Sequence, residues 1–202
     1  MRILLAESHE LICSAIACLL EHCGYEVAGR TGTAADVAEL WCDLRPDVLL
    51  LDLHMPGLDG IATLEAIRAE DTNARSVLLS NFDGEEIVIR SLRAGACGYL
   101  LKSGSPQMLC RCLDTVHAGG RFLSPELADR LATWSGAPTP TQREMDVLTG
   151  VARGLCNKRI GRDLGIGEGT VKAHLKSILR KLDAASRTEA ALIAIRRGLV
   201  QL

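Results

Sequence analysis

Short apolar runs alternate with amphipathic stretches through the first 118 residues, and this alternation constrains the fold more than any other feature. Within most of these runs, apolar residues follow one another instead of alternating with polar ones, as expected for strands that are covered on both faces. Each run is followed by a helix-like stretch. Five strand–helix units in succession predict an α/β fold, a five-stranded doubly wound parallel sheet with helices on both faces. The predicted strands cover 3–6, 25–28, 48–51, 77–79 and 99–101, and the helices cover 11–22, 34–44, 59–70, 84–94 and 106–118.

The chain changes character after this region. Gly119-Gly120 ends the last strand–helix unit, and Ser124-Pro125 opens a short helix with Ser as the N-cap and Pro at the first helical position. That helix extends to about Trp134, and the Pro- and Gly-containing stretch 135–140 is typical of an exposed linker. We therefore predict three regions: a first domain at 1–120, a linker with a short helix at 121–140, and a second domain at 141–202.

The predicted second domain contains four helices and no strand. Thr141 and Glu144 form a capping-box pattern at the start of the first helix, and Asn157 is the predicted cap of the second. Gly165 ends the second helix, and two short helices around such a turn are the signature of a helix-turn-helix. The predicted helices cover 141–153, 157–164 and 168–182, and the fourth starts at a second capping-box pattern, 186–189.

Charge is distributed unevenly along the chain. Residues 1–138 carry 11 Lys+Arg and 19 Asp+Glu, a net charge of −8, although the whole chain carries only −2. Residues 139–202 carry 12 Lys+Arg and 6 Asp+Glu, a net charge of +6. An acidic first part and a basic second part suggest different partners, with nucleic acid a candidate for the basic part. Chance clustering on solvated surfaces is the alternative.

The sequence favours an intracellular, reduced protein. No apolar run approaches the ~18 residues that span a bilayer, and the N-terminus turns acidic at Glu7, unlike a signal peptide. We therefore expect a cytoplasmic protein whose eight cysteines are small buried hydrophobic residues. Cys13, Cys18 and Cys23 suggest a redox or metal site, but their five-residue spacing does not keep them on one helix face.

Polar residues end four of the predicted strands: Glu7, Asp52, Ser80 and Lys102. Ligands of doubly wound sheets bind at the carboxyl ends of the strands, so these side chains are expected to converge on one rim. Two carboxylates suit Mg²⁺, and one of them can act as a nucleophile toward a phosphoryl group while the ammonium offsets negative charge. The alternative is that such residues only cap helices, as Ser8 could do.

The loop after the first predicted strand argues against an enzyme with a nucleotide cofactor. It reads Ala6-Glu7-Ser8-His9-Glu10, which is acidic and lacks the glycines that cradle a phosphate. A flavodoxin-like enzyme with an accessory helical domain is therefore disfavoured, and we expect the chain not to be an enzyme.

Two segments carry a family resemblance. The stretch from Asp47 to Gly60 resembles the phosphoacceptor segment of bacterial response-regulator receiver domains, and the stretch from Gly95 to Lys102 resembles their last strand and lysine. The resemblance covers essentially the whole chain, and its order, a receiver followed by a helix-turn-helix, is that of the NarL/FixJ type. It implies a flavodoxin-like receiver fold and a transcription regulator of a two-component system.

The resemblance also implies roles for individual residues. Asp52 would be phosphorylated by a partner sensor histidine kinase. Glu7, Asp52 and the backbone carbonyl of His54 would hold Mg²⁺, and Ser80 and Lys102 would contact the phosphoryl group.

Two further features of the sequence bear on regulation. Ser80 and Tyr99 would form a switch in which the hydroxyl moves toward the phosphate and the ring turns inward; a ring that only packs beside the sheet edge is the alternative. The family usually has two acidic residues after the first strand, whereas this chain has Glu7-Ser8. The missing acid should weaken Mg²⁺ binding, so a phosphorylation-independent regulator is the alternative function.

The predicted helix 168–182 has two distinct faces. Its apolar residues follow a core-facing stripe, and three basic residues at i, i+4 and i+8 lie on another face. Like charges at this spacing slightly disfavour an isolated helix, so an anion opposite them is favoured over a merely solvated face. The basic residues are Lys172, Lys176 and Arg180.

The stretches 154–161 and 169–175 resemble the LuxR-type four-helix DNA-binding domain. The resemblance implies that 168–182 is the recognition helix in the major groove, and that the last helix pairs two domains into a homodimer on double-stranded promoter DNA. RNA polymerase is a further candidate partner. Base-facing positions would be Lys172, Ala173 and Lys176, and phosphate contacts would come from Lys158, Thr170 and Arg180.

Overall fold

The computed structural model describes residues 1–55, 59–133, 140–197 and 199–200. The chain divides into two compact units, which we describe separately. The first comprises Met1–Asn81 and Val88–Ala128, and the second comprises Phe82–Ile87 and Asp129–Leu202. Residues 134–139 of the predicted linker and the Pro56-Gly57-Leu58 part of the phosphoacceptor segment lie outside the described residues. No helix in the described part of the chain is long and apolar enough to cross a membrane.

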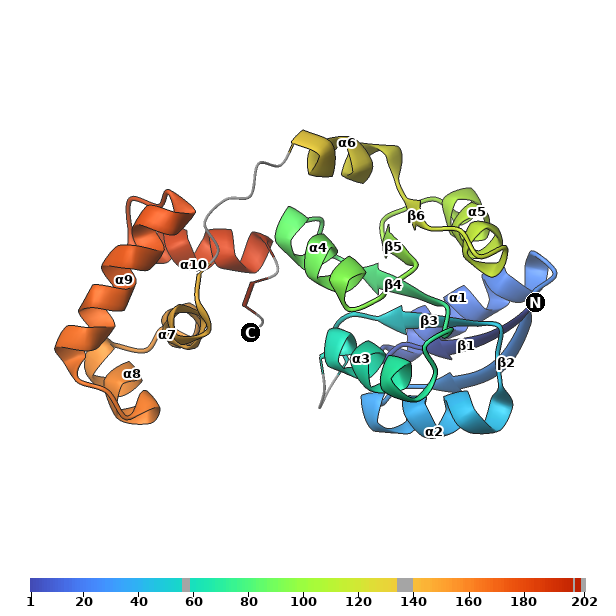
Figure 1. Cartoon of the computed structure of the whole chain (residues 1–202), viewed down its shortest axis with the longest axis horizontal. Helices are drawn as coiled ribbons and strands as arrows, with labels where there is room; N and C mark the ends of the chain where they lie inside the picture. The colour runs from blue at the N-terminus through green and yellow to red at the C-terminus, as the bar shows by residue number, and fades with distance from the viewer. Residues whose placement is uncertain (56–58, 134–139, 198, 201–202) are drawn as a thin grey trace. The chain divides into compact units, whose positions relative to one another are not determined.

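The first unit is built on a parallel sheet with the strand order β2-β1-β3-β4-β5-β6 (Figure 1). This confirms the doubly wound α/β fold, but the prediction of five strands was wrong. The sixth strand pairs with β5 at the sheet edge, and its two residues are too few to give a periodic signal. The strands are β1 (Arg2–Ala6), β2 (Glu26–Thr31), β3 (Val48–Asp52), β4 (Ser76–Ser80), β5 (Gly98–Leu101) and β6 (Phe122–Leu123).

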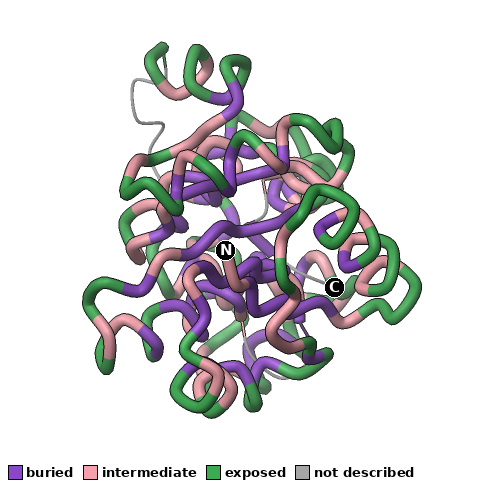
Figure 2. The backbone as a smooth tube through the Cα atoms, turned by 90° about the vertical axis from the view of Figure 1, so that its right-hand side faces the viewer, coloured by how far each residue is buried: buried purple, intermediate pink, exposed green. Residues whose placement is uncertain are grey.

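Helices alternate with these strands and cover the sheet. Leu5, Leu50 and Leu79 pack against Leu20 and Leu113 from two helices, α1 and α5, and thereby form the core on one face. The strands are mostly buried, whereas the helices alternate buried and exposed residues (Figure 2). The helices are α1 (Glu10–His22), α2 (Ala34–Leu44), α3 (Gly60–Glu70), α4 (Glu85–Arg93), α5 (Pro106–His117) and α6 (Pro125–Thr133).

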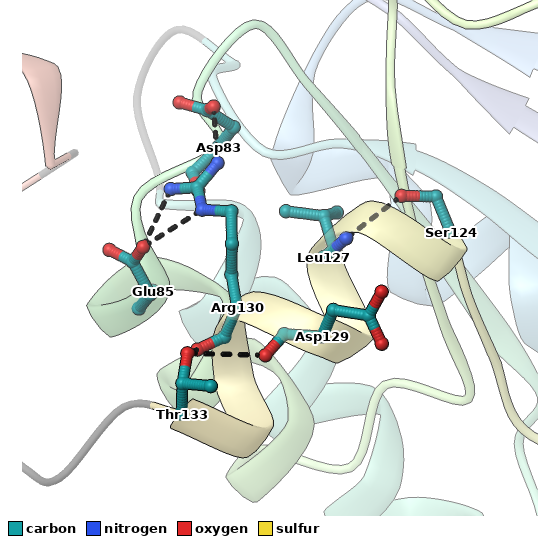
Figure 3. Close-up of polar contacts among 7 residues, drawn as sticks. All are labelled: Asp83, Glu85, Ser124, Leu127, Asp129, Arg130 and Thr133. Carbon is teal, nitrogen blue, oxygen red and sulfur yellow. Dashed lines mark hydrogen bonds and ion pairs between the residues drawn. The ribbon is translucent and has the colours of Figure 1, made fainter.

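The short helix α6 starts where the sequence predicts. The backbone N–H of Leu127 donates to Ser124 Oγ at 3.3 Å, which confirms Ser124 as a cap (Figure 3). Farther along α6, Arg130 donates to Asp83 Oδ2 at 2.6 Å and to Glu85 Oε1 at 2.7 Å (Figure 3). These two ion pairs tie α6 to the start of α4.

The second unit contains the predicted helical bundle. Its helices contribute to a common core, which contains Val147 of α7, Val171 and Ile178 of α9, and Ala194 of α10. Gly165 ends the second of the four helices in a left-handed conformation with φ of 65°, as predicted. The helices are α7 (Gln142–Ala152), α8 (Asn157–Leu164), α9 (Glu168–Leu182) and α10 (Arg187–Arg196).

One of the two predicted capping boxes is complete. Thr141 Oγ1 accepts from the N–H of Glu144 at 3.4 Å, and the carboxylate of Glu144 accepts from the N–H of Thr141 at 2.6 Å. At α10, Ser186 Oγ accepts from the N–H of Glu189 at 3.1 Å. The Glu189 carboxylate, however, accepts from the N–H of Ala185 rather than from that of Ser186.

The predicted cap of α8 was wrong. The N-cap is Cys156, which has the extended conformation of a cap residue, and Asn157 is the first helical residue. The Asn157 side chain instead accepts from Arg187 Nη1 at 3.4 Å. A polar residue near the start of a helix can be the N-cap or the first helical residue. The sequence alone does not distinguish these two positions.

Candidate functional site

The carboxyl ends of β1, β3 and β5 bring three charged side chains together. Lys102 Nζ lies 2.7 Å from Glu7 Oε2 and 2.9 Å from Asp52 Oδ2. The two carboxyl residues are each only 1% exposed. Because Ala6 and Leu51 are register partners on adjacent strands, the residues that follow them lie at the same edge of the sheet. The structure therefore forms the expected acidic rim around a largely buried ammonium.

The two carboxylates have different environments. Burial raises the pKa of Asp52, although its Oδ1 accepts from the N–H of His54 at 3.0 Å and its Oδ2 contacts Lys102. Burial also acts to raise the pKa of Glu7, but Lys102 and the N–H of His9 outweigh it and hold that pKa below its usual value. Glu7 is thus held ionised more firmly than Asp52, and the positive charge of Lys102 is shared between them.

His9 is a site residue that the sequence analysis missed. Its Nδ1 lies 3.2 Å from Glu7 Oε1, and its ring, Glu7 and Asp52 offer ligand atoms that all lie within 4.8 Å of one another. Two carboxylates and an imidazole form a donor set that fits a divalent cation. The loop position of His9, two residues after Glu7, is the only signal that could have indicated its role.

Ser8 does not cap α1. The N-cap is His9, whose side chain makes no capping hydrogen bond, and Ser8 Oγ lies 3.3 Å from His9 Nδ1. The capping interpretation of Ser8 was therefore wrong. The hydroxyl contacts the imidazole that adjoins the acidic rim.

The remaining predicted residues lie on β4 and β5 or directly after β3. Ser80 ends β4 and its carbonyl accepts from the N–H of Lys102 at 2.8 Å, so the two residues are adjacent across the sheet. Ser80 and Tyr99 are both fully buried, which places the Tyr99 ring inside the fold. His54 follows β3 and donates its N–H to Asp52, as described above.

Gly60 fixes the chain against the end of β3. A Cβ at this position would lie 2.8 Å from both the carbonyl oxygen of Asp52 and the Cα of Leu53, which are backbone atoms that cannot move aside. The preceding residue, Asp59, caps α3 by accepting from the N–H of Ile61 at 3.1 Å. The Asp-Gly pair therefore lets α3 start directly beside the candidate phosphoacceptor.

The second unit presents a helix-turn-helix with an exposed basic face. The turn between α8 and α9 is tight, because a Cβ on Gly161 would lie 2.7 Å from the carbonyl oxygen of Ile166. On α9, Lys172 Nζ pairs with Glu168 Oε1 at 2.9 Å. Lys176 and Arg180 form no ion pair with any described residue. The six predicted DNA-contacting residues are all exposed: Lys158, Thr170, Lys172, Ala173, Lys176 and Arg180.

Comparison with known families separates the two parts of the chain. Residues 3–114 match the response regulator receiver domain, and residues 140–194 match the bacterial regulatory proteins of the luxR family. The chain belongs to the two-component response regulators. This confirms the NarL/FixJ-type resemblance, and the response regulator is a DNA-binding transcription regulator with a LuxR-type helix-turn-helix.

Relatives of this response regulator share its full arrangement. The nitrate/nitrite response regulator protein NarL of Escherichia coli (strain K12) is 38% identical over 200 residues, which cover 94% of this chain and 93% of NarL. A nitrate/nitrite response regulator homolog from Haemophilus influenzae is 35% identical, with 96% and 95% coverage. The solved structure of the response regulator ChrA is 28% identical, with a TM-score of 0.56 and 98% of each chain covered.

Proposed function

We propose that this response regulator accepts a phosphoryl group on Asp52 from a sensor histidine kinase, and that phosphorylation promotes the binding of a homodimer to promoter DNA. The observation that carries the proposal is the Lys102 ammonium within 3 Å of both Glu7 and Asp52. The proposal assigns residues 1–120 to the receiver, 121–140 to the linker and 141–202 to the DNA-binding domain. It also places the protein in the cytoplasm, with RNA polymerase as a further partner.

The chemistry assigns one role to each side chain. An Asp52 carboxylate oxygen attacks phosphorus, and the bond from phosphorus to the donor breaks with its electron pair leaving on the donor. Lys102 offsets the negative charge that builds on the transferred oxygens. The Ser80 hydroxyl moves toward the phosphoryl group and contacts it. Tyr99 is the switch residue, whose ring responds to the movement of that hydroxyl.

The acidic rim fits a divalent cation, which we propose to be Mg²⁺. Glu7, Asp52 and the backbone carbonyl of His54 would hold it, and His9 adds a further donor within 4.8 Å of the two carboxylates. When bound, the cation supplies positive charge that neutralises phosphoryl oxygens.

Phosphorylation of Asp52 is tested by intact-mass measurement. Incubation of the full chain with acetyl phosphate and Mg²⁺ is expected to add the mass of one phosphoryl group to the wild type and none to Asp52→Asn. Asp59→Asn is the matched control, because Asn caps α3 as well as Asp does and the acceptor is untouched. That control should be phosphorylated like the wild type.

A phosphorylation-independent receiver is the second candidate function, and Ser8 in place of a metal-binding acid favours it. Under that alternative the wild type gains no mass, or the added mass persists in Asp52→Asn. Either result would contradict phosphorylation at Asp52.

The DNA-binding part of the proposal rests on α9. Lys172, Lys176 and Arg180 are exposed on one face of this helix. Val171, Leu175 and Ile178 on another face are buried in the core. Lys172, Ala173 and Lys176 would face bases, and Lys158, Thr170 and Arg180 would contact phosphates. On α10, Leu192 remains 54% exposed, and pairing of two domains through this helix would cover it.

Replacing Lys176 by Ala is expected to weaken binding to target DNA about tenfold, and the affinity of the wild type should fall as the salt concentration rises. The measurement is fluorescence anisotropy with labelled promoter DNA over a range of salt concentrations. Arg153→Ala is the control, because it removes an exposed cation of the same unit that follows α7 instead of lying on α9. Equal losses in the two variants, or an affinity insensitive to salt, would contradict the assignment of α9.

A further inference from the structure

Two cysteines that lie far apart in the sequence meet between the end of α1 and the middle of α5. Cys110 Sγ lies 2.9 Å from Cys23 Sγ, although 87 positions separate them. Cys23 is exposed and Cys110 is partly buried, so the pair is accessible from solvent. The prediction that all eight cysteines are buried was therefore wrong, and only Cys112 is buried. No other two described cysteines make a hydrogen-bonding contact between their sulfurs.

The surrounding structure holds this pair in place. Cys23 caps the end of α1, and Gly24 turns the chain with a φ of 84° that favours glycine. The next residue, Tyr25, donates its hydroxyl hydrogen to Asp114 Oδ1 at 2.8 Å and lies 3.4 Å from the carbonyl oxygen of Cys110. Tyr25 thus fastens the chain that follows Cys23 to α5, at Cys110 itself and one turn after it, and this keeps the two sulfurs close.

We infer that Cys23 and Cys110 are a redox-active pair that closes to an intramolecular disulfide when the protein meets a peroxide. Both residues lie in the first unit, and the inference does not depend on phosphorylation of Asp52. The five-residue spacing of Cys13, Cys18 and Cys23 argued against a redox site on α1 alone. The partner of Cys23 comes instead from another helix.

A metal site is the competing use of two adjacent thiols, and the structure argues against it. A stable thiolate metal site needs three or four ligands. Among the described residues, the one group of three or more candidate ligands is Glu7, His9 and Asp52, and no group includes Cys23 or Cys110. Two thiols without further ligands favour a disulfide.

The reaction proceeds in two balanced steps. The thiolate of exposed Cys23 attacks one oxygen of hydrogen peroxide, the O–O bond breaks, and the sulfur becomes a sulfenic acid while water leaves after protonation. Cys110 then attacks the Cys23 sulfur, its thiol proton goes to the departing hydroxyl, and a second water leaves as the S–S bond forms. Two thiols and one peroxide give one disulfide and two waters.

The environments of the two thiols support this order of attack. Burial in the first place, and contact with Cys23 in the second, raise the pKa of Cys110 to about 11. Cys110 is therefore protonated at neutral pH and donates its S–H to Cys23. A protonated, partly buried thiol reacts slowly with peroxide but is well placed as the resolving group.

The test uses the full-length reduced protein, treated with hydrogen peroxide, blocked with a maleimide and digested without reductant. We expect one cross-linked peptide pair that contains Cys23 and Cys110 and disappears on treatment with dithiothreitol. The pair should be absent from Cys23→Ser and from Cys110→Ser. It should persist in Cys18→Ser, the matched control, which removes another exposed cysteine of α1.

The thermal stability of the receiver gives a second readout. A bond that closes an 87-position separation restricts the unfolded chain, so the oxidised wild type should unfold about 5–15 °C higher than the reduced protein. Neither single Ser variant should show this rise. The inference is overturned if Cys23 and Cys110 stay maleimide-reactive while exposed Cys42 and Cys156 are oxidised. It is also overturned if Cys23 cross-links to another cysteine or another molecule, or if Cys23 is oxidised to the sulfinic acid.

Discussion

Replacing Lys102 by Ala is expected to lower the free energy of unfolding of the receiver by about 3–5 kcal/mol in metal-free buffer at neutral pH. The Lys102 side chain is 10% exposed and its ammonium lies between two carboxylates that are almost completely buried. Removing it leaves Glu7 and Asp52 to repel each other in a region of low dielectric constant. Such an uncompensated charge costs far more than the lost packing of one side chain.

Magnesium should restore part of this loss. The same carboxylates form the donor set for the proposed cation, and Lys102 competes with the cation for them. Millimolar Mg²⁺ should therefore stabilise Lys102→Ala more than it stabilises the wild type, because the cation binds only the folded state.

Urea unfolding provides the measurement. A Trp134→Phe background leaves Trp41 as the fluorescent reporter, which is buried in α2 and donates to Asp71. The double variant Asp52→Asn/Lys102→Ala is the control, because it removes one buried negative charge together with the positive one. It should be more stable than Lys102→Ala alone and respond less to Mg²⁺. A Lys102→Ala protein within about 1 kcal/mol of the wild type would contradict the account.

The sequence predicted the charged part of the site because that part follows from topology. Glu7, Asp52 and Lys102 each come at or just after the end of a buried parallel strand, and such ends meet at one edge of the sheet. The Thr141–Glu144 capping box was equally predictable, since its two hydrogen bonds depend only on residues three positions apart.

Features that depend on tertiary packing were not predictable in this way. Strand β6 has two residues and exists only because β5 offers it an edge. The role of His9 depends on the path of one loop, and the Cys23–Cys110 contact depends on how α1 packs beside α5. No local pattern encodes contacts of this kind, because their two members lie on different elements.

A buried ion pair in the DNA-binding unit also joins two different helices, and it predicts that the stability of this unit depends on pH. Lys181 Nζ on α9 lies 2.6 Å from Glu144 Oε2 on α7, and the side chain of Glu144 is only 6% exposed. Burial alone would raise the pKa of Glu144, but hydrogen bonds from Lys181, Ser177 and Thr141 lower it from 4.5 to about 2. Glu144, which completes the capping box of α7, thus also fastens α9 to α7.

The sign of the effect follows from the lowered pKa. Because folded Glu144 binds a proton less readily than the unfolded chain does, its contribution to stability is fully present above pH 4.5 and is lost as pH falls toward about 2. A pKa difference of this size corresponds to about 3 kcal/mol.

Glu144→Gln isolates this contribution, because Gln retains the capping hydrogen bonds but cannot titrate. At pH 7 the variant should be about 3 kcal/mol less stable than the wild type, and most of that difference should disappear by about pH 2. Hydrogen exchange of the α7 and α9 amides in the full chain measures the stability of this unit at each pH. At pH 7 Lys181→Met should also be less stable than the wild type, since the Glu144 carboxylate then lacks its counter-charge. If Glu144→Gln follows the same pH curve as the wild type, another group accounts for the acid sensitivity, and Glu144 does not join α7 to α9 through its charge.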